Sequence, residues 1–121
     1  MLGYLMENPQ IYDELERRGD QLRNGFNDHM VGKDLPMCMT GIASFFETHA
    51  KRPPVRSARD LLDQNTEVLY DMQLFLRLNG VHIAWLHDAF ISAAHTDEDV
   101  EHVLRAHIHA AESALKLHNL A

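Results

Sequence analysis

Apolar residues recur at helical spacing in three separate stretches of the chain. In residues 9–26 they fall on one face of a helix, and a turn is expected after it, at residues 28–36. In residues 65–80 a similar stripe ends at Gly80, a residue suited to a left-handed helix stop. The third stretch runs from residue 97 to residue 118. The pattern therefore predicts three amphipathic helices.

The stretches between these helices are typical of short strands. Residues 37–49 are rich in β-branched and aromatic side chains with partial alternation, which predicts one or two strands with Gly41 as a bend or bulge. Residues 81–86 and 89–95 are predicted to pair as a β-hairpin. The order α-β-α-β-β-α indicates an α+β fold, with helices packed on a small, largely antiparallel sheet of three or four strands.

Length and composition restrict the class of protein further. With 121 residues, the chain has room for one core, so residues 1–121 are predicted to form a single domain. The net charge of −7, with scattered basic residues, argues against nucleic acid as a partner. No apolar run approaches the roughly 20 residues that cross a bilayer, and no secretory signal is recognisable, so a cytoplasmic protein without a membrane partner is expected. Residues 1–6 are typical of the middle of a helix, which favours a truncated chain.

The last helix combines acidic residues with several histidines, a mixture that suggests either a metal site or an ordinary helix start. Thr96 and Asp99 have the spacing of a capping box, and the neighbouring acids suit the positive end of the helix dipole. His107 falls on the apolar face and is interpreted as a core-edge residue. His102 and His109 point the other way and stand roughly 10 Å apart, too far to share one ion. We therefore expect a capped helix and no metal site.

Other candidate chemistry is sparse. Cys38 lies in an apolar context and is predicted to be buried and inert. Ser92 and His95 are three positions apart on a predicted strand, which would place them on opposite faces and exclude a nucleophile–base pair. Motifs for a serine nucleophile elbow, a phosphate loop or a CxxC pair do not occur. The sequence predicts no catalytic residue.

Residues 78–107, "LNGVHIAWLHDAFISAAHTDEDVEHVLRAH", resemble the end of the class III pyridoxal-phosphate (PLP) dependent aminotransferases, in the branch of glutamate-1-semialdehyde aminomutase. The family phrase F-x-S-x-A-H-T-x-E-D is matched by Phe90, Ser92, Ala94, His95, Thr96, Glu98 and Asp99. The upstream residues resemble the same C-terminal small domain more weakly, so the likeness extends over nearly all of the chain.

The resemblance implies PLP as the cofactor of a full-length family member, but no cofactor-binding residue in this chain. Lys33, Lys51 and Lys116 match none of the family's cofactor positions, so the chain alone is predicted to be inactive in transamination. The candidates for facing a substrate are Trp85 and His87, although core packing is the favoured role for Trp85. In the aminomutase, a Ser and a Glu stand where this chain has Ala84 and His87, which argues against the aminomutase substrate itself.

Three functions are compatible with these features. The first is a fragment of a PLP-dependent aminotransferase or aminomutase acting on an amino acid or amino-aldehyde, with an apolar patch on its sheet where the missing large domain would sit. The second is an interaction or dimerisation module that keeps the fold, with a second copy of the chain covering that patch. The third and weakest is a small histidine-rich metal binder.

Overall fold

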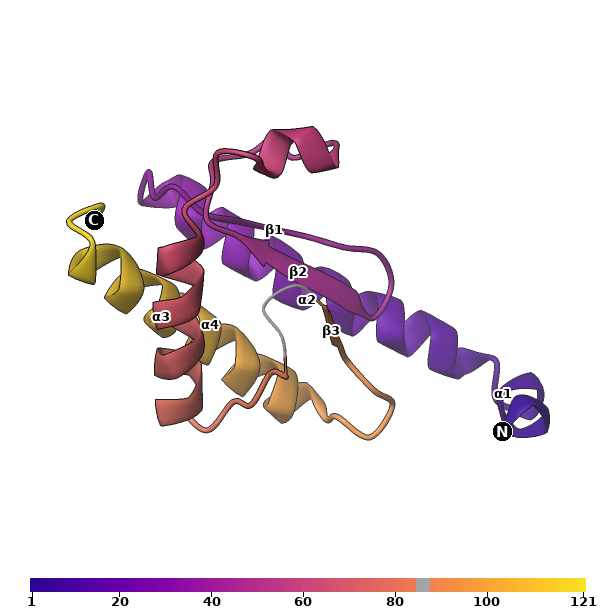
Figure 1. Cartoon of the computed structure of the whole chain (residues 1–121). Helices are drawn as coiled ribbons and strands as arrows, with labels where there is room; N and C mark the ends of the chain where they lie inside the picture. Colours follow the sequence, from indigo (N-terminus) through magenta and orange to yellow (C-terminus); the bar gives the residue numbers. More distant parts are fainter. Residues whose placement is uncertain (85–87) are drawn as a thin grey trace.

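Two long helices, α2 (Gln10–Gly32) and α4 (Asp97–Leu117), lie side by side, and the sheet and the third helix pack against them (Figure 1). The computed structural model describes residues 1–84 and 88–121. Helix α3 (Thr66–Leu78) packs on α4, and the single turn η1 (Ala58–Leu61) lies in the connection before it. Helix α1 (Leu2–Glu7) projects from the start of α2 and contributes no buried residue. The three amphipathic helices predicted from the pattern are thereby confirmed.

The sheet is small, antiparallel and ordered β1-β2-β3. Strands β1 (Cys38–Thr40) and β2 (Phe45–His49) are joined by a tight turn in which Gly41 has a φ of +154°. A side chain there would collide with the backbone at Phe45, so the position favours glycine. The predicted pair of strands with a bend at Gly41 is confirmed, as is the α+β fold class.

The predicted hairpin between residues 81–86 and 89–95 is not formed by the described residues, and residues 85 and 86 of its first strand lie outside them. Residues 81–84 form no strand, and β3 (Ala89–Phe90) pairs with β2 in the register Phe45 with Phe90. The rings of that pair lie 5.3 Å apart, centroid to centroid. Strand pairing is decided by cross-strand packing, and here the open edge of β2 supplies the partner.

Helix α2 is longer than the pattern predicts. The expected turn at residues 28–36 begins only after Gly32, because the helix continues for one more turn and buries Met30 completely. Met30 stands four residues after Phe26 and extends the same apolar stripe. Burial of that side chain outweighs the local turn signal of residues 28–32.

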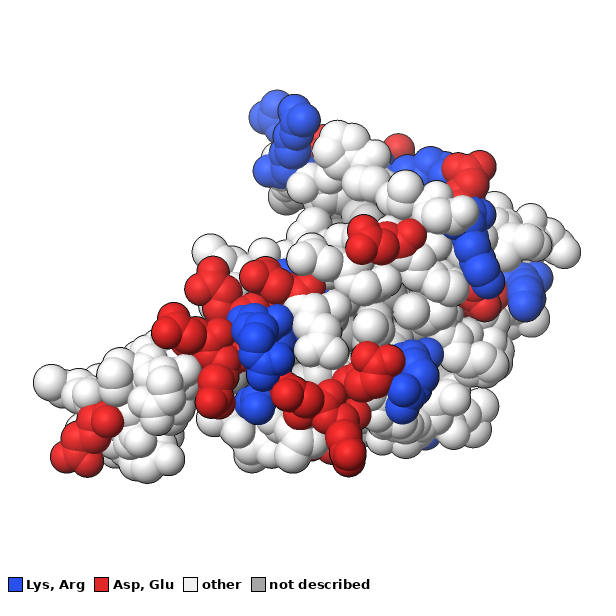
Figure 2. Space-filling view, turned by 180° about the vertical axis from the view of Figure 1, so that it is seen from behind, with Lys and Arg blue, Asp and Glu red and all other residues white. Residues whose placement is uncertain are grey.

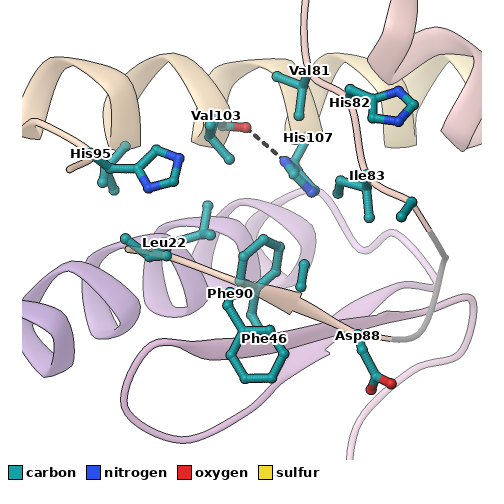
Figure 3. A pocket seen from close by; sticks show the side chains of 14 residues that line it. Leu22, Phe46, Val81, His82, Ile83, Asp88, Phe90, His95, Val103 and His107 are labelled. Carbon is teal, nitrogen blue, oxygen red and sulfur yellow. Dashed lines mark hydrogen bonds between the residues drawn. The ribbon is translucent and has the colours of Figure 1, made fainter. Parts of the chain in front are cut away.

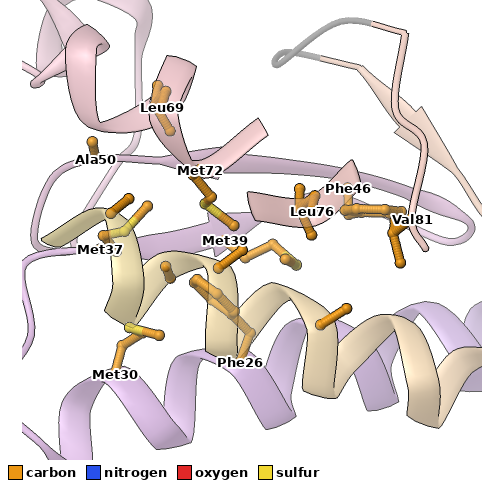
Figure 4. Packing of buried hydrophobic residues seen from close by; sticks show 14 of the residues in the cluster. Phe26, Met30, Met37, Met39, Phe46, Ala50, Leu69, Met72, Leu76 and Val81 are labelled. Atoms are coloured by element: carbon orange, nitrogen blue, oxygen red, sulfur yellow. The ribbon is translucent and has the colours of Figure 1, made fainter. Parts of the chain in front are cut away.

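The core lies between α2, α3, α4 and the inner face of the sheet (Figure 4). Methionines fill much of it, with Phe26 and Phe46 between them. Flexible thioether side chains suit the irregular space where helices meet a short, twisted sheet. Among the described residues, no helix is both long and apolar enough to span a membrane.

Candidate functional site

A hollow of about 340 Å³ opens beside β3, between α4 and the sheet (Figure 3). Its lining comes from α2, β2 and α4, and from residues 81–84 and 88–95. The apolar part consists of Leu22, Phe46, Val81, Ile83, Ala84, Ala89, Phe90, Ile91, Val100 and Val103. The polar part consists of His82, Asp88, His95 and His107. The site is thus a mainly apolar depression with imidazoles and one carboxyl group around it.

His107 is the buried polar side chain of this hollow. Its side chain reaches back along α4, and Nδ1 donates a hydrogen bond to the Val103 carbonyl oxygen at 2.8 Å. The ring meets Phe46 edge to face, at a centroid distance of 5.5 Å. Only 1% of the residue is exposed, and burial lowers the pKa of the imidazole to about 4. The ring is therefore neutral at pH 7, and Nε2 carries the lone pair, since Nδ1 carries the proton.

The Nε2 atom of His107 is buried without a hydrogen-bond partner among the described residues. The sequence placed this histidine on the apolar face of the helix, which the burial confirms, but interpreted it as a core-edge residue. The signal that could have found it is a polar residue in line with Val100, Ala111 and Leu115 on one helix face.

Ser92 and His95 are in contact, contrary to the prediction from the sequence. The Ser92 amide lies 2.9 Å and its Oγ 3.0 Å from Nδ1 of His95. The prediction fails because the residues after Ile91 form a turn and not a strand, so positions three apart meet. Nδ1 accepts the amide proton, and the contact closes the turn that leads into α4. It also holds the His95 ring at the hollow.

The acidic start of α4 is a capping box, as predicted. The Asp99 amide donates to Thr96 Oγ1 at 3.1 Å, and the Thr96 amide donates to Asp99 Oδ2 at 2.7 Å. This backbone hydrogen bond from Thr96 holds the pKa of the Asp99 carboxyl below its usual range. Asp97 bonds to Arg17 and Arg18 of α2. The described residues contain no group of three or more side chains placed to hold a metal ion.

The two candidates for facing a substrate, Trp85 and His87, lie outside the described residues, and their role stays a prediction. The residues on either side of them, Ala84 and Asp88, line the hollow. Cys38 is buried as predicted, and burial raises the pKa of its thiol to about 11.

The residues of this chain do not fit PLP by themselves. Lys33 bonds to Glu112 at 2.7 Å, Lys51 bonds to Asp63 at 2.5 Å, and Lys116 lies near the end of α4. No lysine or arginine is among the described residues that line the hollow. PLP enzymes hold the cofactor through a lysine Schiff base and groups that neutralise the phosphate. The described residues therefore supply neither anchor at this site.

Comparison with known proteins gives consistent relatives. No protein-family model matches the chain. The glutamate-1-semialdehyde 2,1-aminomutase of Methanothermobacter thermautotrophicus is 34% identical over 99 residues, which are 80% of this chain and 24% of that protein. The enzyme of the same name from Thermus thermophilus is 32% identical over 109 residues, 87% of this chain and 25% of that protein.

Solved structures share the fold. A β-phenylalanine aminotransferase from Variovorax paradoxus superposes with a TM-score of 0.76 at 24% identity, over 88% of this chain and 24% of its own. A transaminase with PLP bound superposes with a TM-score of 0.73 at 20% identity, over 90% and 24%. The chain thus spans about a quarter of the proteins it matches. It is similar in sequence to about a quarter of the length of the glutamate-1-semialdehyde 2,1-aminomutases, and its fold is one found in transaminases, as the sequence resemblance predicted.

Proposed function

We propose that this chain is the C-terminal small domain of a PLP-dependent class III aminotransferase or aminomutase, and that a large domain outside the chain supplies the cofactor site. The observation that carries the proposal is the coverage: relatives at 32–34% identity match 80–87% of this chain but only 24–25% of their own length. A domain with this role packs on the cofactor-bearing part. It forms one wall of a site whose reactive groups lie elsewhere.

The placement of the lysines supports the proposal that the cofactor site belongs to a separate large domain. Two of the three lysines in the chain are held in ion pairs with Glu112 and Asp63, and none lines the hollow. A PLP enzyme needs a lysine amine for the Schiff base to the cofactor aldehyde. Transamination by the isolated chain is therefore not expected, and the lysine belongs to the missing large domain.

Exposed apolar side chains mark surfaces that a further domain would cover. At the sheet, Phe90 is 66% exposed beside Phe45, where a patch was predicted. Helix α1 exposes Leu2 and Met6, and its end of the molecule carries little charge (Figure 2). Exposed apolar patches are typical of interfaces. We assign these surfaces to contact with the large domain, and dimer formation of the whole enzyme follows the same proposal.

The substrate proposed for the whole enzyme is an amino acid or amino-aldehyde, the class on which the aminomutases act by name. Ala84 departs from the serine that the resemblance implies at this position, so a substrate other than glutamate-1-semialdehyde is favoured. Trp85 and His87 are the proposed substrate-facing residues. The absence of a spanning helix among the described residues is compatible with a cytoplasmic enzyme.

The size of the native gene product tests the proposal. An antibody against this chain, used to probe an extract of the source cell, should reveal a band about 3.5 times the mass of the chain, because the 99 and 109 aligned residues are only 24% and 25% of the relatives. A band at 13.9 kDa would contradict the proposal. It would favour the alternative, a stand-alone interaction or dimerisation module, whose partner a pull-down would then identify.

A further inference from the structure

The chemistry of the hollow beside β3 limits what it can bind. No lysine or arginine lines it among the described residues, and the chain as a whole carries a charge of −7. A carboxylate or phosphate would lose its hydration there without gaining a lysine or arginine partner, and it would lie near the carboxyl group of Asp88. Most of the wall is apolar, including the fully or nearly fully buried Leu22, Phe46 and Val100. Uncharged organic molecules match such a wall.

One polar atom in this wall lacks a partner. His107 donates through Nδ1 to Val103, so Nε2 presents a lone pair, and no described residue donates to it. Figure 3 shows the ring among the side chains of the hollow, with its Nε2 edge turned away from Val103. A buried acceptor without a donor costs free energy, and such groups in folded proteins are normally satisfied by protein, water or ligand. An acceptor can be satisfied only by a molecule that brings an O–H or N–H group.

We propose that the hollow beside β3 binds a small uncharged aromatic or branched aliphatic molecule that carries one hydroxyl or N–H donor, and that His107 Nε2 accepts this hydrogen bond. The volume of about 340 Å³ lies within the usual range for small-molecule sites. The apolar body of the ligand packs against Phe46 and Val103, and its donor supplies the partner that Nε2 lacks. The inference does not depend on the proposed aminotransferase role.

A single buried water is the competing occupant. A small void of about 20 Å³ touches the same His107 ring, together with Thr48, Gln73 and Ile83. That is enough room for one water molecule, which could donate to Nε2. If this water fully satisfies Nε2, a ligand that carries a donor gains no affinity from it. A ligand with a donor and one without should then bind equally well.

The test uses two probes of nearly the same shape, phenol and toluene, titrated into the whole chain by calorimetry at pH 7. Phenol carries a donor and toluene does not, so the proposal expects phenol to bind about three- to tenfold more tightly, the usual net effect of one hydrogen bond. The ¹⁵N signal of His107 Nε2, followed in histidine-labelled protein, should shift with phenol and not with toluene. Equal affinities, tighter binding of toluene, or no binding of either probe would overturn the proposal and leave the water as occupant.

Two variants separate the cavity from the acceptor. Val103→Phe fills the hollow and should abolish binding of both probes, while His107→Phe keeps an aromatic ring and should remove the preference for phenol. His109→Phe, on the exposed face of the same helix, is the matched control and should bind like the parent. Unchanged binding to Val103→Phe would place the probes elsewhere and refute the site. If His107→Phe does not fold, the two-probe comparison and the ¹⁵N signal on the parent chain still decide the question.

Discussion

His107 is a buried side chain through which pH acts on the stability of the folded state. Its pKa of about 4 lies below the ordinary value of 6.5, so the unfolded chain takes up this proton at a higher pH than the folded chain. The stabilisation from the neutral ring is complete above pH 6.5 and is lost as the pH falls toward 4. We expect this group to lower the free energy of unfolding by on the order of 3 kcal/mol between pH 7 and pH 4.

Urea unfolding at a series of pH values checks this expectation. The variant His107→Phe removes the titrating group and should show a much weaker dependence on pH between 6.5 and 4. His109→Phe, which changes an exposed histidine two residues further along the same helix, should keep the dependence of the parent chain. If His107→Phe and the parent lose stability in parallel over this window, the buried neutral ring is not the cause.

Cys38 gives a second prediction at the scale of one residue. It is 3% exposed, and burial raises the pKa of its thiol from 9.0 to about 11. Two units leave about 100-fold less thiolate at pH 8, and the thiolate is the reactive form. Iodoacetamide should therefore label the folded chain at least about 100-fold more slowly than the same chain in urea. Comparable rates in the two states would show that the site opens freely.

At the scale of elements, the capping box of α4 can be tested against a matched threonine. Thr96 accepts the Asp99 amide through its hydroxyl, whereas Thr66 at the start of α3 leaves the cap to Asn65. Thr96→Ala should therefore cost about 1 kcal/mol of unfolding free energy, and Thr66→Ala less than about 0.5 kcal/mol. Thermal and urea unfolding measure both, and equal costs would assign no special role to the cap.

Where α2 contacts the turn before β2, replacing Gly19 by alanine is expected to destabilise the chain, which is unusual inside a helix. Alanine normally stabilises a helix interior by about 1 kcal/mol relative to glycine. A Cβ at Gly19 would press on the Ala43 carbonyl, which Arg23 also holds through a hydrogen bond of 2.8 Å, so Gly19→Ala should destabilise by about 1–3 kcal/mol. Gly32→Ala has open space and should be neutral or stabilising. Stabilisation by both changes would refute the close approach.

How far the sequence predicts an element depends on where its stabilising contacts lie. The helices follow from a local apolar period and local caps, so α3 and α4 were placed to within a residue or two. Strand β3 has two residues and exists because the edge of β2 accepts it, a contact between positions about 45 apart in the chain. A local pattern contains no information about that edge. The last turn of α2 depends likewise on the tertiary burial of Met30.

At the scale of the whole molecule, the hollow could not be predicted because Leu22 of α2 and Phe46 of β2 meet side chains from residues 81–107 there, far along the sequence. The sequence placed His107 on the correct helix face, but its unsatisfied Nε2 follows only from the packing of β2 and the segment after α3 around the ring. The family resemblance supplied what packing could not. It led to the expectation that the cofactor lysine lies outside the chain, and this expectation stays a prediction.

Glu112 of α4 links that helix to the end of α2 through contacts with His29 and Lys33, and this link responds to pH. Glu112 of α4 lies 2.7 Å from Lys33 Nζ and 2.8 Å from His29 Nε2, and these bonds lower the pKa of its carboxyl from 4.5 to about 2. Because the folded-state pKa is lowered, the stabilisation is present above pH 4.5 and is lost as the pH falls toward 2. Because the lysine is exposed to solvent, which screens the ion pair, the stabilisation at pH 7 is limited to about 1 kcal/mol.

Glu112→Gln should therefore unfold at lower urea concentration than the parent at pH 7, and the two curves should converge as the pH approaches 2. Glu101→Gln is the matched control, because Glu101 lies on the same helix and, among the described residues, forms its ion pair with Arg105 of that helix. It should leave the difference between pH 7 and pH 2 unchanged. A constant gap between Glu112→Gln and the parent at every pH would mean that Glu112 joins the helices by packing, and that its charge contributes nothing.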